Sequence, residues 1–313
     1  MSGLSRKVTI IGAGSVGSTI AYTLSRETIA SEIVLIDVNK EKAHGEVMDI
    51  EQGTAFRDPI TIKSGDYADA AGSSIVIITS GIARKPGQTR LELAQTNVNI
   101  IKSIAPEITA VAPDALYIIV SNPVDVLTYV FMKVSGIPEN HIIGSGTLLD
   151  TARLRYKLSE HFGVAQSNVH TYVLGEHGDT SLVPWSVSSI AGVSVDEYAD
   201  LLNIDPVDKD EVLHYVRKSG GEIIANKGAT YYAVSASVVK ICSILMSATD
   251  TITSVSCMMH GEYGIEDVCL STSVLIGPNG FKGRVPLRIS YSEEKKLRQS
   301  ADALKEIISQ LEI

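Results

Sequence analysis

One histidine of this chain stands in a setting that suits acid–base chemistry. His177 lies in the segment LGEHGD, directly after an apolar run and flanked by glycines. Glycines let the backbone and a bound molecule approach closely, and an imidazole exchanges a proton near neutral pH. Because a histidine taken alone is more often structural, its predicted role as a proton carrier depends on the residues that accompany it.

An aspartate and two arginines occupy one predicted helix, in the segment LDTARLR. Asp150 either caps this helix or accepts the second imidazole N–H and stabilises the imidazolium. Arg153 lies on the same helix face as Asp150, whereas Arg155 lies on the opposite face. We assign Arg153 to a substrate carboxylate, because a guanidinium can form two parallel hydrogen bonds with it. The alternative for Arg153 is a surface ion pair.

A polar segment punctuated by Gly and Pro, residues 81–90, separates a predicted strand from a predicted helix. This composition predicts a mobile lid. Thr89 and Glu92 form a T-x-x-E capping box that places Arg90 at the first helical position. Closure of the lid would carry the charge of Arg90 onto a substrate carbonyl, with a solvated arginine as the alternative.

These side chains supply the three groups that a dehydrogenase of 2-hydroxy acids requires. The hydroxyl needs a proton acceptor, the carboxylate needs a cation, and the carbonyl of the reverse reaction needs a polarising donor. His177, Arg153 and Arg90 are the respective candidates. We therefore predict hydride transfer to or from the hydroxyl-bearing carbon of a small 2-hydroxy acid.

The N-terminal region contains a glycine pattern that is typical of dinucleotide binding. An apolar run leads into GAGSVG, which spans Gly12–Gly17, and a helix-like stretch follows. The glycines permit a tight turn, and the helix N-terminus favours the negative charge of a pyrophosphate. Asp37 ends the next predicted strand, where its carboxylate would accept hydrogen bonds from ribose and repel a 2′-phosphate. NAD is therefore preferred over NADP, although Lys40 lies nearby; an ordinary strand-ending aspartate is the alternative.

The elements that must position these residues follow from the hydrophobic pattern. Residues 1–146 alternate β-branched runs with helical stretches, which predicts a Rossmann-type, doubly wound parallel sheet. Residues 147–313 are less regular and predict a mixed α+β substrate domain. The predicted strands are Val8–Ile11, Ile33–Val38, Ile75–Thr79, Leu116–Val120, Ile142–Ile143 and Val169–Leu174. The predicted helices of the second half are Asp150–Phe162, Tyr231–Ala248 and one from Ser292 onward.

Composition disfavours several other classes of function. With 27 Lys and Arg against 36 Asp and Glu, the formal charge is −9, the wrong sign for a surface that binds nucleic acid. No apolar run is long enough to span a membrane and the N-terminus lacks a signal-peptide core, so we expect a cytoplasmic protein. Cys242, Cys257 and Cys269 lack the spacing of a disulfide framework or zinc site, and we expect them to be reduced and buried.

The motifs GAGSVG, SNPVD, LDTAR, GEHGD and KGAT together resemble the lactate and malate dehydrogenase superfamily over nearly the whole chain. The resemblance implies direct hydride transfer between nicotinamide and C2 without a metal. It implies that His177 is the acid/base and Asp150 its partner. It also implies that Arg153 anchors the carboxylate, that Arg90 polarises the carbonyl, and that Asn122 bonds near the reacting oxygen and the nicotinamide. The residues predicted to contact the cofactor are Gly12, Gly14, Ser15, Val16, Gly17, Asp37, Gly81, Asn122 and Ser145.

Within this family, the segments GSGTLLDTARLR, GEHGDTSLVPWS and KGATYY are similar to those of bacterial lactate enzymes. Glu176, Gln88 and Thr230 stand where malate enzymes usually differ. Arg84 instead stands in the lid where malate enzymes usually carry arginine. The resemblance therefore predicts reversible reduction of pyruvate to L-lactate, with oxaloacetate and malate as the alternative pair. The residues predicted to contact the substrate are Arg153, Asn122, Arg84, Gln88 and Thr230.

Arg155 and His170 match the positions at which allosteric members of the family bind fructose 1,6-bisphosphate across a subunit interface. An arginine and a protonatable histidine, doubled by symmetry, suit a phosphorylated anion. An interface or surface pair without a ligand is the alternative. The family also implies a homotetramer.

Two other classes of protein are open to the same sequence. A non-catalytic NAD-binding sensor would need only the glycine turn and Asp37. A scaffold built on the same fold would be expected to lack at least one of the chemical residues. The joint presence of the histidine, its aspartate and the two arginines favours an enzyme.

Overall fold

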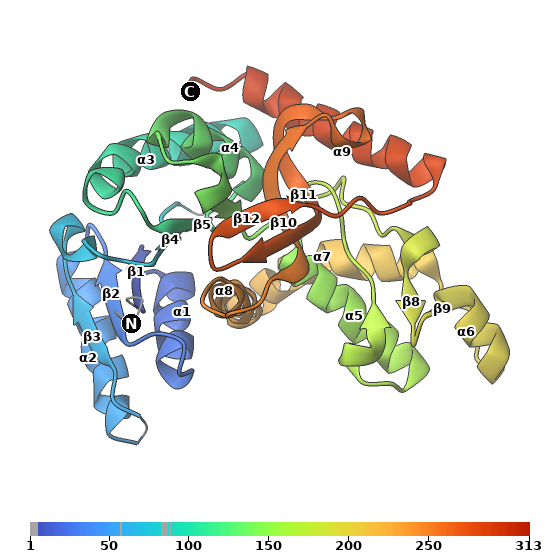
Figure 1. Ribbon diagram of the computed structural model, residues 1–313, viewed down its shortest axis with the longest axis horizontal. Helices are drawn as coiled ribbons and strands as arrows, with labels where there is room; N and C mark the ends of the chain where they lie inside the picture. The colour runs from blue at the N-terminus through green and yellow to red at the C-terminus, as the bar shows by residue number, and fades with distance from the viewer. Residues whose placement is uncertain (1–5, 57, 83–86, 88) are drawn as a thin grey trace.

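A nine-stranded sheet forms the centre of the molecule, in the order β12-β11-β10-β6-β5-β4-β1-β2-β3 (Figure 1). The computed structural model describes residues 6–56, 58–82, 87 and 89–313. Strands β1 to β6 pair in parallel, and the chain winds outward from β1 in both directions, so this part of the sheet is doubly wound. Their bounds are β1 (Lys7–Ile11), β2 (Glu32–Ile36), β3 (Thr61–Ser64), β4 (Ile75–Ile78), β5 (Leu116–Ile119) and β6 (Ile142–Gly144).

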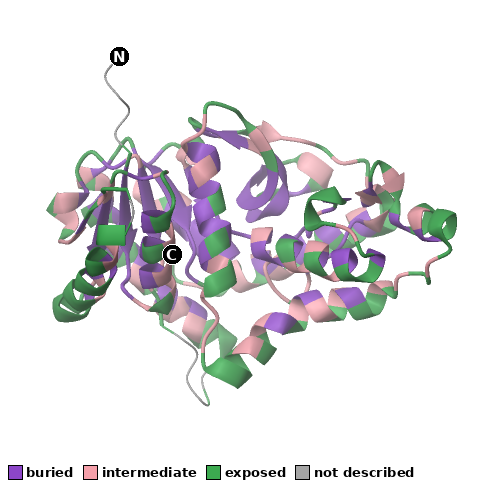
Figure 2. Cartoon of the chain, turned by 90° about the horizontal axis from the view of Figure 1, so that it is seen from below, coloured by how far each residue is buried: buried purple, intermediate pink, exposed green. Residues whose placement is uncertain are grey.

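Helices cover both faces of the sheet, and alternating side chains along each strand build a core on each side. In β1, Ile10 belongs to the core formed with α1, α2 and α8, whereas Ile11 belongs to the core formed with α3, α4 and α9. Figure 2 shows the buried strands between helices whose outer surfaces are exposed. The helix bounds are α1 (Ser15–Arg26), α2 (Lys40–Gln52), α3 (Arg90–Val111), α4 (Val124–Ser135), α8 (Tyr232–Leu245) and α9 (Tyr291–Ser309).

An antiparallel three-stranded meander from the second half of the chain extends the same sheet. Strands β10 (Thr251–His260), β11 (Glu266–Gly277) and β12 (Gly280–Arg284) pair in sequence, and β10 joins β6 through Ser256 and Gly144. A Cβ at position 144 would lie 2.9 Å from the Ser256 Cβ, so the junction requires glycine. The sheet thus crosses the predicted domain boundary at 146/147, which stays a prediction.

The rest of the second half forms a smaller α+β region with its own core. It contains α5 (Leu148–Phe162), α6 (Val195–Leu202), α7 (Lys209–Lys227) and the small sheet β7 (Val169–His170), β8 (Ser189–Ile190) and β9 (Val193–Ser194). Leu154, Phe162 and Val216 are among the residues of its buried cluster. The predicted fold class, a Rossmann-type sheet followed by a mixed α+β region, is confirmed.

The predicted strand over Val169–Leu174 is not continuous, because residues 171–173 form no strand pairing. Val169 and His170 pair with β8, and Leu174 forms an isolated antiparallel bridge with Leu182. The backbone of Val173 bonds instead to side chains of α5: its N–H donates to Thr151 Oγ1, and its carbonyl accepts from Thr147 Oγ1. These side-chain partners replace a strand ladder, so an extended apolar run here does not become a longer strand.

Local signals elsewhere were accurate. The capping box at α3 is present: Thr89 Oγ1 accepts from the Glu92 N–H at 3.1 Å, and Glu92 accepts from the Thr89 N–H at 2.8 Å. The three cysteines are free and buried, as expected. Among the described residues, no helix is long and apolar enough to cross a membrane, and no group of His, Cys, Asp and Glu could hold a metal ion.

Candidate active site

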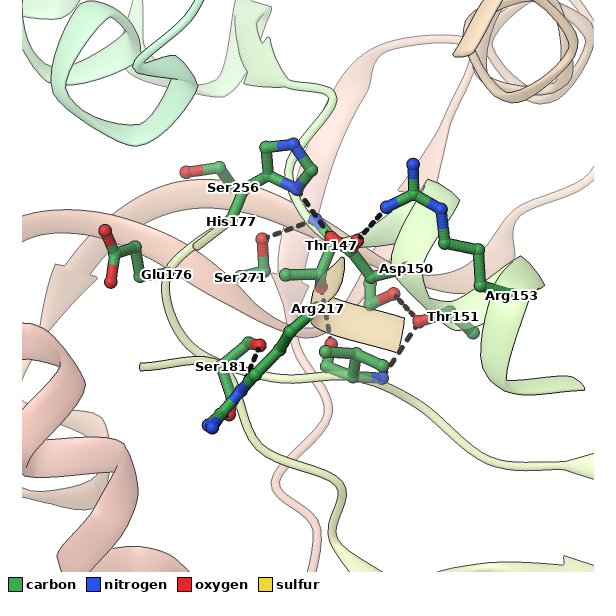
Figure 3. A network of polar contacts seen from close by, with 12 residues as sticks. Thr147, Asp150, Thr151, Arg153, Glu176, His177, Ser181, Arg217, Ser256 and Ser271 are labelled. Atoms are coloured by element: carbon green, nitrogen blue, oxygen red, sulfur yellow. Dashed lines mark hydrogen bonds and ion pairs between the residues drawn. The ribbon is translucent and has the colours of Figure 1, made fainter. Parts of the chain in front are cut away.

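One carboxylate, that of Asp150, joins the predicted proton carrier to the predicted carboxylate anchor. His177 Nδ1 lies 2.5 Å from Asp150 Oδ2, and Arg153 Nη1 donates to Asp150 Oδ1 at 2.8 Å (Figure 3). The side chains of Asp150 and Arg153 are 7% and 12% exposed, respectively. Arg153 is therefore no surface ion pair, and the structure brings these three predicted residues together.

Helix α5 directs Asp150 toward the histidine. The helix begins at Leu148 with Thr147 as its N-cap residue, so Asp150 lies in the first turn rather than at the cap. The alternative in which Asp150 only caps the helix is wrong. The hydroxyls of Thr147 and Thr151 bond to the backbone of Val173, in the segment that leads into His177. These bonds hold the first turn of α5, and with it Asp150, close to the histidine.

The electrostatic surroundings favour a protonated imidazole beside an ionised aspartate. Burial opposes the imidazolium, but the charge and hydrogen bond of Asp150 raise the pKa of His177 above its ordinary value. Burial also opposes the carboxylate, yet His177 and Arg153 hold the pKa of Asp150 below its ordinary value. With Nδ1 bonded to Asp150, Nε2 is the atom able to exchange a proton with a substrate.

The same residues line a cavity of about 520 Å³ that draws on both halves of the chain. A cavity of this size has room for a small acid beside a nicotinamide ring. His177, Asp150 and Arg153 are among its polar lining residues. Four further residues of the sequence prediction line it, namely Val16, Gly81, Asn122 and Thr230.

Asn97 is a lining residue that the sequence analysis missed. Its side chain accepts from the Ile82 N–H at 2.9 Å and donates to the Asn122 carbonyl at 2.7 Å. It therefore joins the start of the lid segment to the SNPVD loop. A local signal existed, because Asn97 is a polar residue one turn from Ala94 and Ile101 on the buried face of α3.

Arg217 on α7 is a second missed lining residue. Its guanidinium donates to the Ser181 carbonyl, and burial lowers its pKa, although Asp179 and Glu176 oppose that effect. Nearby on the same helix, a Cβ at Gly220 would lie 3.4 Å from Arg153 Nη2. Helix α7 thus brings a second cation to the cavity while leaving room for the anchor. Arg217 belongs to no motif, so only tertiary packing reveals it.

The glycine turn has the geometry that a pyrophosphate site requires. Gly12 has a φ of +110°, and a Cβ there would lie 2.6 Å from Thr79 Oγ1. A Cβ on Gly17 would lie 1.8 Å from the Gly12 carbonyl oxygen. Gly14 caps α1, and Ser15 is its exposed first residue, so free backbone N–H groups face outward at a positive helix end.

Asp37 lies against this turn. Its carboxylate accepts the Ala13 N–H at 2.6 Å and the Asn39 N–H at 2.8 Å, and the side chain is half-buried. Each oxygen keeps lone pairs for ribose hydroxyls. The turn, the helix end and this carboxylate fit NAD.

Several predicted contacts lie away from the cavity or outside the described residues. Ser145 is buried, donates from its backbone N–H to the Ile119 carbonyl at 2.8 Å, and is not among the described lining residues. Arg84 and Gln88 lie outside the described part of the chain. Their predicted contacts with a substrate stay predictions.

Arg90 lies on the surface in this structure. Its side chain is 76% exposed and pairs with Asp179 at 2.8 Å, while Lys218 lies 3.6 Å from the same carboxylate. Arg90 is not among the described residues that line the cavity. To polarise a substrate, it would have to leave Asp179 and swing inward.

Arg155 and His170 lie in one region on the far side of α5. Arg155 Nη2 donates to the carbonyl of Thr171, the neighbour of His170, at 3.4 Å. Within the described chain, the buried Arg155 Nε has no hydrogen-bond partner. His170 is exposed on β7. The two arginines of α5 therefore face different parts of the molecule, Arg153 toward Asp150 and Arg155 toward the Thr171 carbonyl, as the helical spacing predicted.

The cofactor turn, the histidine–aspartate pair and the arginine anchor define the class as NAD-dependent dehydrogenases of 2-hydroxy acids. Residues 6–144 match the lactate/malate dehydrogenase NAD binding domain, and residues 147–312 match the alpha/beta C-terminal domain of the same family. The chain belongs to the lactate/malate dehydrogenase family.

Similar proteins agree with this assignment over almost the full chain. L-lactate dehydrogenase 1 of Clostridium acetobutylicum is 46% identical, covering 97% of this chain and 98% of its own. An L-lactate dehydrogenase of Acetivibrio thermocellus is 47% identical, covering 98% of each. The crystal structure of the minor L-lactate dehydrogenase of Enterococcus mundtii, in its ligands-bound form, has a TM-score of 0.95 at 36% identity and covers 99% of each chain.

Proposed function

We propose that this protein catalyses the reversible NADH-dependent reduction of pyruvate to L-lactate. The observation that carries the proposal is the arrangement of His177 and Arg153 around the single carboxylate of Asp150 at the cavity wall. It supports one site in which a proton is held beside a carboxylate anchor. The relatives named L-lactate dehydrogenase support lactate rather than malate as the product.

In this mechanism His177 supplies the proton. The Asp150 carboxylate fixes the Nδ1–H tautomer and stabilises the imidazolium, so that Nε2–H points its proton toward the C2 oxygen of pyruvate. NADH, when bound, supplies the hydride for C2. As negative charge develops on the oxygen, the proton passes from Nε2 to it, and the neutral imidazole accepts a proton again in the reverse direction.

The two arginines orient the substrate and polarise its carbonyl group. Arg153 uses one N–H for Asp150 and has others to grip the substrate carboxylate, which sets the position of C2. Arg90, after release from Asp179, would place its charge on the carbonyl oxygen. Closure of the lid would also exclude water from the reacting atoms.

We predict that kcat/KM for pyruvate exceeds that for oxaloacetate by at least about ten-fold in the presence of NADH. Arg84 is the residue that argues for oxaloacetate, so Arg84→Gln should lower activity on oxaloacetate and spare activity on pyruvate. Steady-state kinetics of both proteins on both acids provide the measurement. A preference of the unaltered enzyme for oxaloacetate would replace lactate with malate as the product.

We further propose a cytoplasmic homotetramer that serves fermentation and is activated by fructose 1,6-bisphosphate. The unpaired Nε of Arg155, close to His170, supports an anion site on the outer side of α5. In a symmetric assembly two such clusters meet and double the positive charge. Reoxidation of NADH from sugar breakdown is the metabolic setting that fits this reaction.

Fructose 1,6-bisphosphate should lower the half-saturating pyruvate concentration by about ten-fold at mildly acid pH. The bisphosphate carries several negative charges, so the guanidinium of Arg155 and the neighbouring imidazole of His170 are the groups expected to bind it. Pyruvate saturation curves with and without the sugar bisphosphate measure it, with His170→Gln as the variant that should lose the response. Identical curves for the unaltered enzyme at acid pH would remove the effector from the proposal.

A further inference from the structure

A second carboxylate lies behind His177 and has no role in the mechanism above. Asp125 is the second residue of α4 and is 2% exposed. Its Oδ2 accepts the backbone N–H of His177 at 2.7 Å, and its Oδ1 accepts from Ser256 Oγ of β10 at 2.6 Å. Within the described chain, no Lys, Arg or His side chain forms an ion pair with it.

Hydrogen bonding alone does not explain a charge at this place. An asparagine would satisfy the same two partners, because its amide oxygen can accept from the His177 N–H and its amide nitrogen can donate to Ser256 Oγ. A buried carboxylate without a paired cation is costly. Burial indeed raises the pKa of Asp125 to about 6, although the two hydrogen bonds oppose that effect. The charge is thus retained near neutral pH at a cost that the asparagine would avoid.

We propose that Asp125 is a positioning residue for His177. It holds the histidine through the backbone, and its negative charge favours the imidazolium that donates the proton. His177 therefore lies between two carboxylates, with Asp150 at the ring and Asp125 at the main chain. The catalytic part of this inference rests on the proposed function, whereas the effect on the imidazole belongs to the protein itself.

The other charged and titratable groups around this pair come from three places. Arg153 of α5 opposes the imidazolium, and Asp150 favours it. Glu176, the neighbour of His177, disfavours a charged Asp125. The buried Cys269 thiol of β11 is also within electrostatic reach of Asp125, and burial keeps it protonated by raising its pKa.

The decisive variant is Asp125→Asn. NMR titration of the labelled His177 imidazole in the folded protein should move to lower pH. The alkaline limb of pyruvate reduction should move in the same direction, so that kcat on that limb falls roughly three-fold, while KM for pyruvate stays within about two-fold. A residue that only supported the fold would leave both titrations in place.

Glu293→Gln is the matched control. Glu293 is another buried carboxylate, 8% exposed, and it accepts the backbone N–H groups of Ser186 at 3.0 Å and Ser290 at 2.8 Å. The substitution Glu293→Gln also replaces a buried carboxylate with its amide, but at a site that makes no hydrogen bond to His177 among the described residues. The control is expected to lower the melting temperature and to leave the His177 titration unchanged.

An unchanged His177 titration in folded Asp125→Asn overturns the proposal. If that variant does not fold, the carboxylate carbon of Asp125 is followed in the unaltered protein and in His177→Asn. Loss of the imidazolium should move the Asp125 titration to higher pH, and an unmoved titration also overturns the proposal. Both NMR measurements need no turnover, so they remain decisive even if pyruvate proves not to be the substrate.

Discussion

Replacing His177 with asparagine is expected to lower kcat for pyruvate reduction by about 10³-fold, the loss typical of removing a general acid. Asparagine keeps a polar side chain of similar reach, but it cannot donate a proton and regain it near neutral pH. The Asp150 carboxylate would keep its partner Arg153, so the buried charge stays paired. Stopped-flow and steady-state measurement of NADH consumption under saturating pyruvate test the expectation.

The affinity of His177→Asn for NADH shows whether the substitution removes only the proton transfer or also disrupts the cofactor site. Gly12 and Asp37 of the cofactor site are not among the described residues that line the cavity with His177, so the Kd for NADH, measured by fluorescence, should stay within about two-fold in His177→Asn. Turnover within a few-fold of the unaltered enzyme would mean that another group carries the proton, and the assignment of His177 would then be abandoned.

The pH dependence of the unaltered enzyme provides a second check on the same residue. Since Asp150 raises the pKa of His177, the imidazolium persists above the ordinary histidine range. Pyruvate reduction needs this charged form, so its rate is maintained at low pH and falls as pH rises through the raised pKa. Lactate oxidation needs the neutral form and should rise through the same pH. His177→Asn should lose both limbs.

Arg153→Lys is expected to lower kcat/KM for pyruvate by about 10²-fold to 10³-fold, because an ammonium group cannot form the two parallel hydrogen bonds of a guanidinium. The lysine keeps a positive charge near Asp150, so the change tests geometry more than charge. We expect kcat to fall and KM to rise, because a loosely held substrate carboxylate leaves C2 poorly aligned with the nicotinamide. Steady-state kinetics with pyruvate measure the effect.

Arg298→Lys is the control for this substitution. Arg298 is 50% exposed and pairs with Glu294 on α9, so the same exchange there should leave kcat/KM unchanged within about two-fold. If Arg153→Lys behaved like this control, Arg153 would be a structural partner of Asp150 rather than the anchor. Arg217, the other arginine among the described residues that line the cavity, would then be the next candidate.

The sequence by itself determined the features that depend on neighbours along the chain. The glycine turn at 12–17, the capping box that starts α3 at Arg90, and the strands β1, β2, β4 and β5 were all predictable to within one or two residues. Helical spacing also placed Arg153 beside Asp150 and Arg155 away from it. Each of these signals acts over one or two turns or over the period of a strand, so the residue types alone carry it.

Only the tertiary structure decided which distant groups meet. It joined β10 to β6 through Gly144, it interrupted a predicted strand at 171–173 with side-chain hydrogen bonds from α5 to Val173, and it brought Arg217 to the cavity. Asp125 is the clearest case, because in the sequence it is only the last letter of SNPVD. Its proposed role depends on hydrogen bonds with His177 and Ser256, which are 52 and 131 positions away, and on burial that removes water from its charge. Contacts of that range depend on packing of the whole fold, which no local pattern encodes.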